Sequence, residues 1–140
     1  MQFDTFTIQR STTATTDIID ITDETNQQLR DLQVTTGQLT LFIGGSTAAL
    51  STIEFEPGAV SDLKAAIERL LPTTLSYDHD RRWGDGNGYS HVRAAWFQPD
   101  LTIPVIDGRM ALGTWQQVIL LDFDNRPRQR QVLGQVLHNG

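Results

Sequence analysis

The alternation of apolar and polar residues along the chain predicts about eight strands. Residues 3–9 (FDTFTIQ) alternate large apolar side chains with polar ones, which is typical of a strand with one buried face. Residues 38–44 (QLTLFIG) form an apolar run flanked by glycines, as a central strand does. The same criteria place further strands at residues 13–22, 91–97, 101–106, 116–124 and 128–138, and the last four form two hairpins.

Two segments have the spacing of amphipathic helices instead. Residues 56–72 repeat apolar residues at intervals of three and four and end at Pro72. Residues 20–37 begin with capping and acidic residues, have a narrow apolar side and end at Gly37. Helices early in the chain followed by hairpins predict a single α+β domain over residues 1–140, with a mixed, largely antiparallel sheet and two main helices.

Composition and charge exclude several classes of protein. Of the 140 residues, 39% are hydrophobic and 20% are charged, which is typical of a globular domain. The net charge of −6 disfavours nucleic acid as a partner, because binding a phosphate backbone requires a basic face. No apolar run approaches the roughly 20 residues that cross a bilayer, and no targeting signal is visible, so we expect no membrane partner and a cytoplasmic location. The absence of cysteine excludes disulfides and thiolate metal ligands.

The densest set of chemically active side chains lies in residues 76–91 (SYDHDRRWGDGNGYSH). This segment holds His79 and His91, two of the chain's three histidines, around a glycine-rich turn. Neutral imidazole is a common ligand for zinc-like ions, and neighbouring elements often present two of them. The segment is either a site or a solvated connection, and spacing alone leaves both open.

Other polar residues have a structural explanation beside a functional one. Glu54 follows a strand and could act as a general base or a metal ligand, or could simply be exposed there. Residues 44–50 (GGSTAAL) could hold an anion on backbone amides, although a tight turn between a strand and a helix needs only the glycines. Trp115 and Gln116 could form the floor of a pocket for a flat ligand, or the tryptophan could belong to the core.

Structural roles account for the remaining charged residues of interest. Asp62 lies in the first turns of the second predicted helix, where the helix dipole stabilises it. Arg126, Arg128 and Arg130 alternate along the last hairpin, which predicts a solvated strand face. His138 is expected in the C-terminal tail.

Several segments, in order, resemble the YjbQ-like family, whose members are also called secondary thiamine-phosphate synthase enzymes. They are LTLFIGGSTAAL (39–50), YDH (77–79), GDGNGYSH (84–91), LTIPVIDGRMALGTWQQVILLDFD (101–124) and PRQR (127–130). The resemblance implies that family's α+β, mixed-sheet fold and a homotrimer. It also implies a weak, secondary thiamine-phosphate synthase activity, which joins a hydroxymethylpyrimidine pyrophosphate to a thiazole phosphate and releases pyrophosphate, while the primary role is unknown.

The resemblance carries the family's histidine motifs over position by position. His79 matches the histidine of a Y-x-H segment, and His91 closes an N-x-x-x-H segment that starts at Asn87. In the family these histidines suit a divalent metal such as zinc or magnesium. The third family histidine, in an H-T-T-A segment, is replaced here by Gly45. Three outcomes follow: Glu54 or a loop aspartate substitutes as a ligand, the pocket binds an anion in place of a metal, or the ancestral chemistry is lost.

The resemblance also implies a pocket formed by Ser46, Thr47, Glu54, His79, Asn87, His91 and Gln116. Trp115 lies beside Gln116 in a segment that matches the family's G-T-W-Q. Glu54 and Asp62 both fall on acidic positions of the family. In an active member the histidines would bind metal or phosphate and Glu54 would transfer a proton. Arg81, Arg82 and Arg93 are the nearest cations by sequence for a pyrophosphate leaving group. The alternative function is a non-catalytic trimer that binds phosphate or a small phosphorylated metabolite after losing the metal site.

Overall fold

The computed structural model describes all 140 residues and contains two sheets and four helices. The larger sheet has the strand order β1 (Gln2–Thr12), β8 (Arg128–His138), β3 (Gly37–Ile43), β5 (Asp100–Ile106) and β6 (Arg109–Met110). The smaller sheet has the order β2 (Asp17–Asp20), β7 (Gln116–Asp122) and β4 (Ala48–Glu54). Every strand pair is antiparallel, so the predicted α+β class with a largely antiparallel sheet is confirmed.

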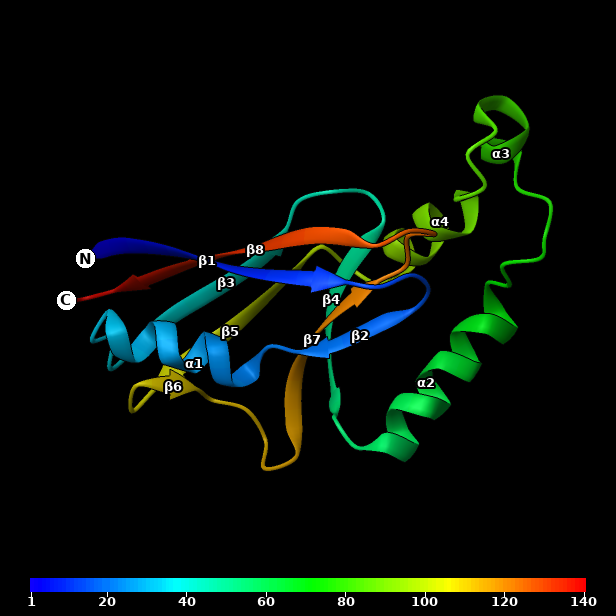
Figure 1. Ribbon diagram of the computed structural model, residues 1–140. Helices are drawn as coiled ribbons and strands as arrows, with labels where there is room; N and C mark the ends of the chain where they lie inside the picture. The colour runs from blue at the N-terminus through cyan, green and yellow to red at the C-terminus, as the bar shows by residue number, and fades with distance from the viewer.

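The helices are α1 (Thr22–Asp31), α2 (Pro57–Leu70), α3 (Asp78–Trp83) and α4 (Gly88–Trp96). Helix α1 lies along one side of the larger sheet, and α2 and α3 project from the end of the molecule opposite the chain termini (Figure 1). None of the four combines the length and the hydropathy that a membrane-spanning helix requires.

The main core lies between the two sheets and α1. It contains 17 buried residues, among them Leu29 of α1, Leu41 of β3 and Leu120 of β7, each without exposed surface. A second cluster packs the other face of the smaller sheet against α2 and α4, through residues that include Ile67 and Ala94. Strand β7 is therefore covered on both faces, which explains its continuous apolar run. The outer cover of this sheet includes α4, which carries part of the candidate site.

Residues 91–97, predicted as a strand, belong largely to helix α4, so the prediction of a hairpin there was wrong. Tyr89 and Arg93 are buried four residues apart, as are Ser90 and Ala94, and this spacing is that of one helix face. Short apolar runs fit both a strand and a helix, and here the buried arginine concealed the helical period.

Other boundaries differ from the prediction as well. The glycine-rich residues 44–50 lead into strand β4 and not into a helix, because Ala48 and the two residues after it pair with β7 in its buried centre. Helix α1 ends at Asp31, earlier than predicted, and Gln33 leaves it with a left-handed φ of 58°. The predicted helix over residues 56–72 is confirmed as α2.

Candidate functional site

Two short helices present the loop histidines side by side. His79 lies in α3 and His91 in α4, and their ring centroids are 4.5 Å apart. Gly84 caps the end of α3 with a φ of 70°. Gly88 starts α4 so close to Tyr77 that a Cβ on this glycine would lie 2.5 Å from the Tyr77 Cβ. The glycines thus allow the chain to fold one helix back against the other, and the segment is structured and not a solvated connection.

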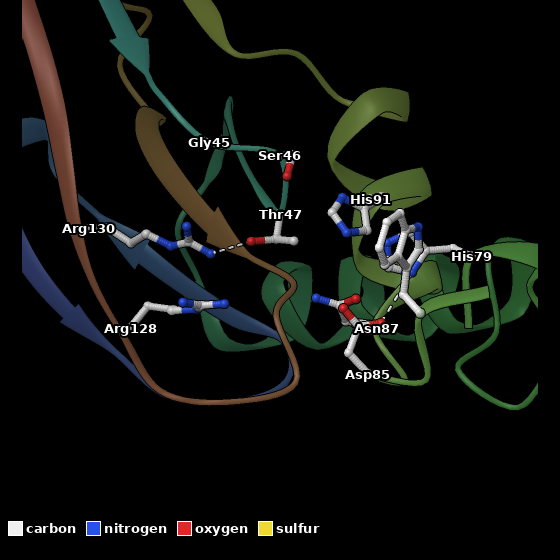
Figure 2. A pocket seen from close by; sticks show the side chains of 10 residues that line it. Gly45, Ser46, Thr47, His79, Asp85, Asn87, His91, Arg128 and Arg130 are labelled. Atoms are coloured by element: carbon white, nitrogen blue, oxygen red, sulfur yellow. Dashed lines mark hydrogen bonds and ion pairs between the residues drawn. The ribbon is translucent and has the colours of Figure 1, made fainter. Parts of the chain in front are cut away.

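A hollow of about 510 Å³ opens beside these rings. Figure 2 shows the two histidines on one side of it and Arg128 and Arg130 of β8 on the other. The residues that line it are Gly45, Ser46, Thr47, His79, Trp83, Asp85, Asn87, His91, Arg128 and Arg130. The turn between β3 and β4, the two short helices and β8 therefore meet at one place, and we call this the histidine–arginine pocket.

Arg130 is fixed at the pocket by a buried carboxylate. Its Nε donates to Asp122 Oδ2 at 2.7 Å, and its Nη2 donates to Asp122 Oδ1 at 2.9 Å and to Thr47 Oγ1 at 2.7 Å. Asp122 has no exposed side-chain surface, and the side chain of Arg130 is 11% exposed. Arg128 is held in the same way, since its Nε donates to the buried Asp124 Oδ2 at 2.7 Å.

The prediction that Arg128 and Arg130 lie on a solvated strand face was wrong. Side chains two residues apart on a strand share a face, and the buried Val132 and Val136 have the same parity as these arginines. The sequence therefore contained the signal that both arginines point inward. Only the structure supplies the carboxylates that make inward arginines stable.

Asp124 remains ionised beneath the pocket. Burial raises the pKa of this carboxyl, but the Asn125 backbone N–H, the Arg128 guanidinium and further bonds from Asn87 and Thr47 together lower it below its usual value. The ionised carboxylate can then hold Arg128 through a charge-assisted bond.

Gly45 leaves open space in front of Arg130. The φ of Gly45 is +124°, and a Cβ built there would lie 3.4 Å from Arg130 Nη1. That nitrogen makes no hydrogen bond inside the chain, unlike Nε and Nη2. The position at which the family resemblance implies a histidine is therefore open here, and an unused N–H donor faces it.

Carboxylates surround His79. Its Nδ1 lies 3.3 Å from Asp85 Oδ1 and 3.5 Å from Asp80 Oδ1, and one ligand atom from each of the three residues lies within 4.8 Å of the others. The Asn87 side-chain amide lies between Asp124 and Asp85. In one orientation its nitrogen donates to Asp124 Oδ1 at 3.4 Å. With the amide oxygen and nitrogen exchanged, the nitrogen donates instead to both carboxylate oxygens of Asp85, each at 3.2 Å. His91 is outside this group of three, although both histidines line the pocket.

Three residues expected in the pocket do not line it: Glu54, Trp115 and Gln116. Glu54 ends β4 and pairs with Gln116, whereas Thr47 precedes the start of β4. The seven residues of that strand separate the two ends by about 20 Å. Glu54 and Trp115 line a second hollow of about 410 Å³. A single chain therefore does not bring Glu54 or the G-T-W-Q segment to the histidines, which corrects the expected composition of the pocket.

The arginines expected to face a pyrophosphate are not in the pocket. Arg93 is 1% exposed. Its Nη2 donates to Glu68 Oε2 at 2.6 Å, and its Nε donates to the Leu71 carbonyl, so the guanidinium is already engaged within the chain. Arg81 pairs with Asp78 on α3, and Arg82 stacks on Trp83 at 5.7 Å; both arginines are exposed, as is Asp62 on α2. Arg81 and Arg82 are therefore exposed on α3 and do not line the pocket, although they are close to His79 in the sequence.

His138 is not in a loose tail, as the sequence had predicted. It is the last residue of β8, is buried, and its Nε2 lies 2.7 Å from Asp4 Oδ2. The bond to His138 lowers the pKa of the Asp4 carboxyl. The pair ties the first strand to the last at the edge of the sheet.

The family model and the related sequences agree on one family. The family model "UPF0047 protein YjbQ-like" matches residues 6–139. A UPF0047 protein of Archaeoglobus fulgidus is 36% identical over 121 residues, which are 86% of this chain and 91% of that protein. A UPF0047 protein of Methanothermobacter thermautotrophicus is 35% identical over 116 residues, which are 83% of this chain and 79% of that protein.

Solved structures agree with these matches. The crystal structure of a YbjQ-like protein of unknown function from Sulfolobus solfataricus superimposes with a TM-score of 0.92 at 26% identity, over 99% of both chains. A hypothetical protein from Aeropyrum pernix gives a TM-score of 0.86 at 27% identity, over 99% of this chain and 100% of that one. With both sequence and fold matched over nearly its whole length, this chain belongs to the YjbQ-like UPF0047 family.

Proposed function

We propose that the histidine–arginine pocket binds the phosphate group of a small metabolite. The observation that carries this proposal is the orientation of Arg130. Asp122 occupies its Nε and Nη2, and the free Nη1 is directed at the open space in front of Gly45. Guanidinium N–H groups fixed in advance bind phosphate oxygens strongly and with little loss of side-chain entropy.

The opposite wall supports the same ligand. His79 and His91 present two imidazoles across the hollow from the arginines (Figure 2), and an imidazole can donate to a phosphate oxygen. Because Asp122 and Asp124 neutralise the two arginines, the pocket has no large excess of positive charge. Affinity then depends on directed N–H groups and on any cation that accompanies the ligand.

A divalent cation fits the group formed by His79, Asp80 and Asp85. The set offers one imidazole nitrogen and two carboxylate oxygens within 4.8 Å of one another. Oxygen-rich sets suit magnesium or manganese, whereas three imidazoles suit zinc. Asp85 then takes the part that the third family histidine would have, and His91 is left to contact the ligand. The cation would neutralise phosphate charge at the histidine side of the pocket.

Thiamine-phosphate synthesis is the catalytic form of this proposal. In that reaction the thiazole nitrogen attacks the methylene carbon of the pyrimidine, a C–N bond forms, the C–O bond breaks, and pyrophosphate leaves with the electron pair. Arg130 and the cation near Asp85 would stabilise the departing pyrophosphate. Glu54 has no part in this scheme within one chain, because it lies at the far end of β4. Assaying the purified protein with both substrates tests this reaction. If the wild type forms no more product than the double variant His79→Ala/His91→Ala, the chain does not catalyse thiamine-phosphate synthesis.

Calorimetric titration with inorganic phosphate and with pyrophosphate tests the binding proposal. We expect Arg130→Gln to weaken binding by at least about tenfold, and His91→Ala by about two- to tenfold. Arg126→Gln, an exposed arginine in the same hairpin, is the matched control and should bind like the wild type. His91 makes no hydrogen bond that supports the fold, so its variant separates loss of ligand contact from misfolding. Equal affinity in all four proteins, or no binding by the wild type, would overturn the proposal.

Manganese binding, followed by electron paramagnetic resonance, tests the cation separately. We expect Asp85→Asn to lower manganese affinity by at least about tenfold, because even outer-shell partners of a metal contribute that much. His91→Ala should leave the affinity unchanged, since His91 is not in the group of three. The reverse result, with loss in His91→Ala and none in Asp85→Asn, would contradict this ligand set and favour a centre built on both histidines.

A further inference from the structure

A smaller hollow adjoins the histidine–arginine pocket. Its volume is about 240 Å³, and the residues that line it are Gly45, Ser46, Ala48, His91, Ala94, Ala95 and Pro99. Gly45, Ser46 and His91 line the histidine–arginine pocket as well, so the two hollows meet along a shared edge. Beyond that edge the lining consists of three alanines and a proline, without any charged side chain. We call this space the alanine hollow.

Helix α4 forms one wall of the alanine hollow. Ala94 and Ala95 follow His91 by three and four residues, which places all three side chains on neighbouring positions of one helix face. The imidazole that we propose contacts phosphate is therefore followed, along the helix, by two methyl groups. Alanine at these positions leaves the space open that a longer side chain would fill.

Backbone hydrogen bonds fix the opposite wall. The Ile43 N–H donates to the Pro99 carbonyl at 2.8 Å, and the Leu50 N–H donates to the Gln98 carbonyl at 2.8 Å. These bonds tie the segment after α4 to the end of β3 and to β4, where Ala48 is buried. The alanine hollow is therefore formed before any ligand arrives, and a group that enters it does not have to order its walls.

Gly45 places the alanine hollow next to the free N–H donor of Arg130. A Cβ at this glycine would lie 3.4 Å from Arg130 Nη1, and Gly45 lines both hollows. Figure 2 shows the turn of Gly45 and Ser46 between Arg130 on one side and His91 on the other. A phosphate group bound at Nη1 thus lies beside the opening of the alanine hollow, and a group esterified to that phosphate can extend into it.

The lining determines which kind of group gains from this position. Methyl groups and a proline ring offer no hydrogen bonds, so a hydroxyl buried among them would lose its bonds to water without replacement. A hydrocarbon gains about fourfold in affinity for each CH₂ that is buried. The volume of about 240 Å³ lies below the roughly 300 Å³ at which pockets for drug-sized ligands begin, so the group must be compact.

We infer that the phosphate ligand of this protein is an ester of a compact hydrocarbon alcohol, whose carbon atoms occupy the alanine hollow. Sugar phosphates, which carry hydroxyl groups at the same place, are disfavoured. This inference rests on the proposed phosphate site, and it adds the chemical class of the organic part of the ligand.

Calorimetric titration of the wild type with three phosphate monoesters tests the inference. Methyl phosphate, isobutyl phosphate and glycerol phosphate share the same charged group and differ in what is attached to it. We expect isobutyl phosphate to bind at least about tenfold more tightly than methyl phosphate, because it adds three carbon atoms that the alanine hollow can bury. Glycerol phosphate should bind no more tightly than methyl phosphate.

A leucine in the alanine hollow should remove this preference. Ala95 is exposed and leucine is a good helix former, so Ala95→Leu should fold like the wild type, with unchanged circular dichroism. The new side chain would occupy the hollow, and we expect the ratio of the two affinities to fall below about threefold. Ala65→Leu, at an exposed position on α2, is the matched control and should keep the ratio of the wild type.

The outcomes separate this inference from the proposed phosphate site. Equal affinity of the wild type for methyl and isobutyl phosphate would overturn the inference and leave the phosphate site in place, without reference to any variant. A preference for isobutyl phosphate that persists in Ala95→Leu would also overturn it, because the hydrocarbon would then lie elsewhere. If none of the three esters binds to the wild type, both the inference and the phosphate site are wrong.

Discussion

Arg130 and Asp122 form a two-point ion pair directly behind the candidate pocket, with Nε to Oδ2 at 2.7 Å and Nη2 to Oδ1 at 2.9 Å. The pair joins β8 of the larger sheet to the end of β7 in the smaller one. The same contact thus holds the two sheets together and sets the direction of the free Nη1. Stability and ligand binding are coupled at this residue.

Removing the carboxylate should therefore be costly. We expect Asp122→Ala to lower the free energy of unfolding by about 3–5 kcal/mol, because it leaves a nearly buried guanidinium without its partner. Urea denaturation followed by circular dichroism measures this loss. Asp31→Ala, at an exposed position on α1, should change stability by less than about 0.5 kcal/mol. A loss below about 1 kcal/mol for Asp122→Ala would mean that water replaces the pair.

The pKa of Asp124 predicts how stability depends on pH. Burial raises this pKa, but the hydrogen bonds to the carboxylate outweigh burial, and the folded-state pKa lies below the usual value of 3.8. A depressed pKa contributes stability that is fully present above the unfolded-state pKa and is lost as pH falls through the folded-state pKa. We expect the stability difference between wild type and Asp124→Asn to be constant above about pH 5 and to shrink below about pH 4.

Urea unfolding of both proteins at a series of pH values measures this difference. Asp4 and Glu68 also have lowered pKa values and contribute to acid unfolding, but they are common to both proteins and cancel in the difference. A difference that is independent of pH down to pH 2 would show that folding does not change the pKa of Asp124.

Period-two patterns in the sequence predicted β1 and β8, and the spacing of apolar residues predicted α2, because in these elements burial follows the local period. Helix α4 escaped detection because the residue at its buried centre is Arg93, whose burial depends on Glu68 and on the Leu71 carbonyl. Those partners come from α2 and the chain just after it, so no local pattern could reveal them.

The candidate site was predictable to the same limited extent. The glycine-rich loop between α3 and α4 brought His79 and His91 together as hypothesised, since turn chemistry is local. The role of Arg130 in the pocket was missed because alternation shows which residues share a strand face, but not that a buried carboxylate, here Asp122, pairs with the arginine. Glu54 was placed wrongly because the sequence order of motifs does not fix the length of the strand between them.

Gly134 lies opposite Phe6 in the β1–β8 pair, and the phenyl ring covers it. A Cβ at this glycine would lie 2.2 Å from the Phe6 ring, so Gly134→Ala must displace the ring from the core. We expect a loss of about 1–3 kcal/mol in the free energy of unfolding. In the double variant Phe6→Ala/Gly134→Ala the clash disappears, and the combined loss should be smaller than the sum of the two single losses. Additive losses, measured by urea denaturation, would contradict the contact.

Gly45→His introduces the residue type that the family resemblance implies at this position, and its outcome decides between two kinds of site. The φ of +124° disfavours any side chain here, which predicts a cost of about 1–3 kcal/mol in stability. The new imidazole would also occupy the space next to Arg130 Nη1, so phosphate affinity should fall. Because the proposed cation ligands are His79, Asp80 and Asp85, manganese affinity should stay unchanged.

Gly44→His is the matched control for this substitution. Gly44 has no positive φ, and a Cβ there would meet nothing closer than the Phe42 ring at 3.9 Å. The control should keep both the stability and the phosphate affinity of the wild type. Elemental analysis of the purified proteins measures their zinc content. Stoichiometric zinc in Gly45→His, with none in the wild type or the control, would contradict the prediction. It would show that His79 and His91 can bind zinc together with a third imidazole. The lack of a third imidazole would then explain why the wild-type chain holds no zinc, and the oxygen-rich cation site would be wrong.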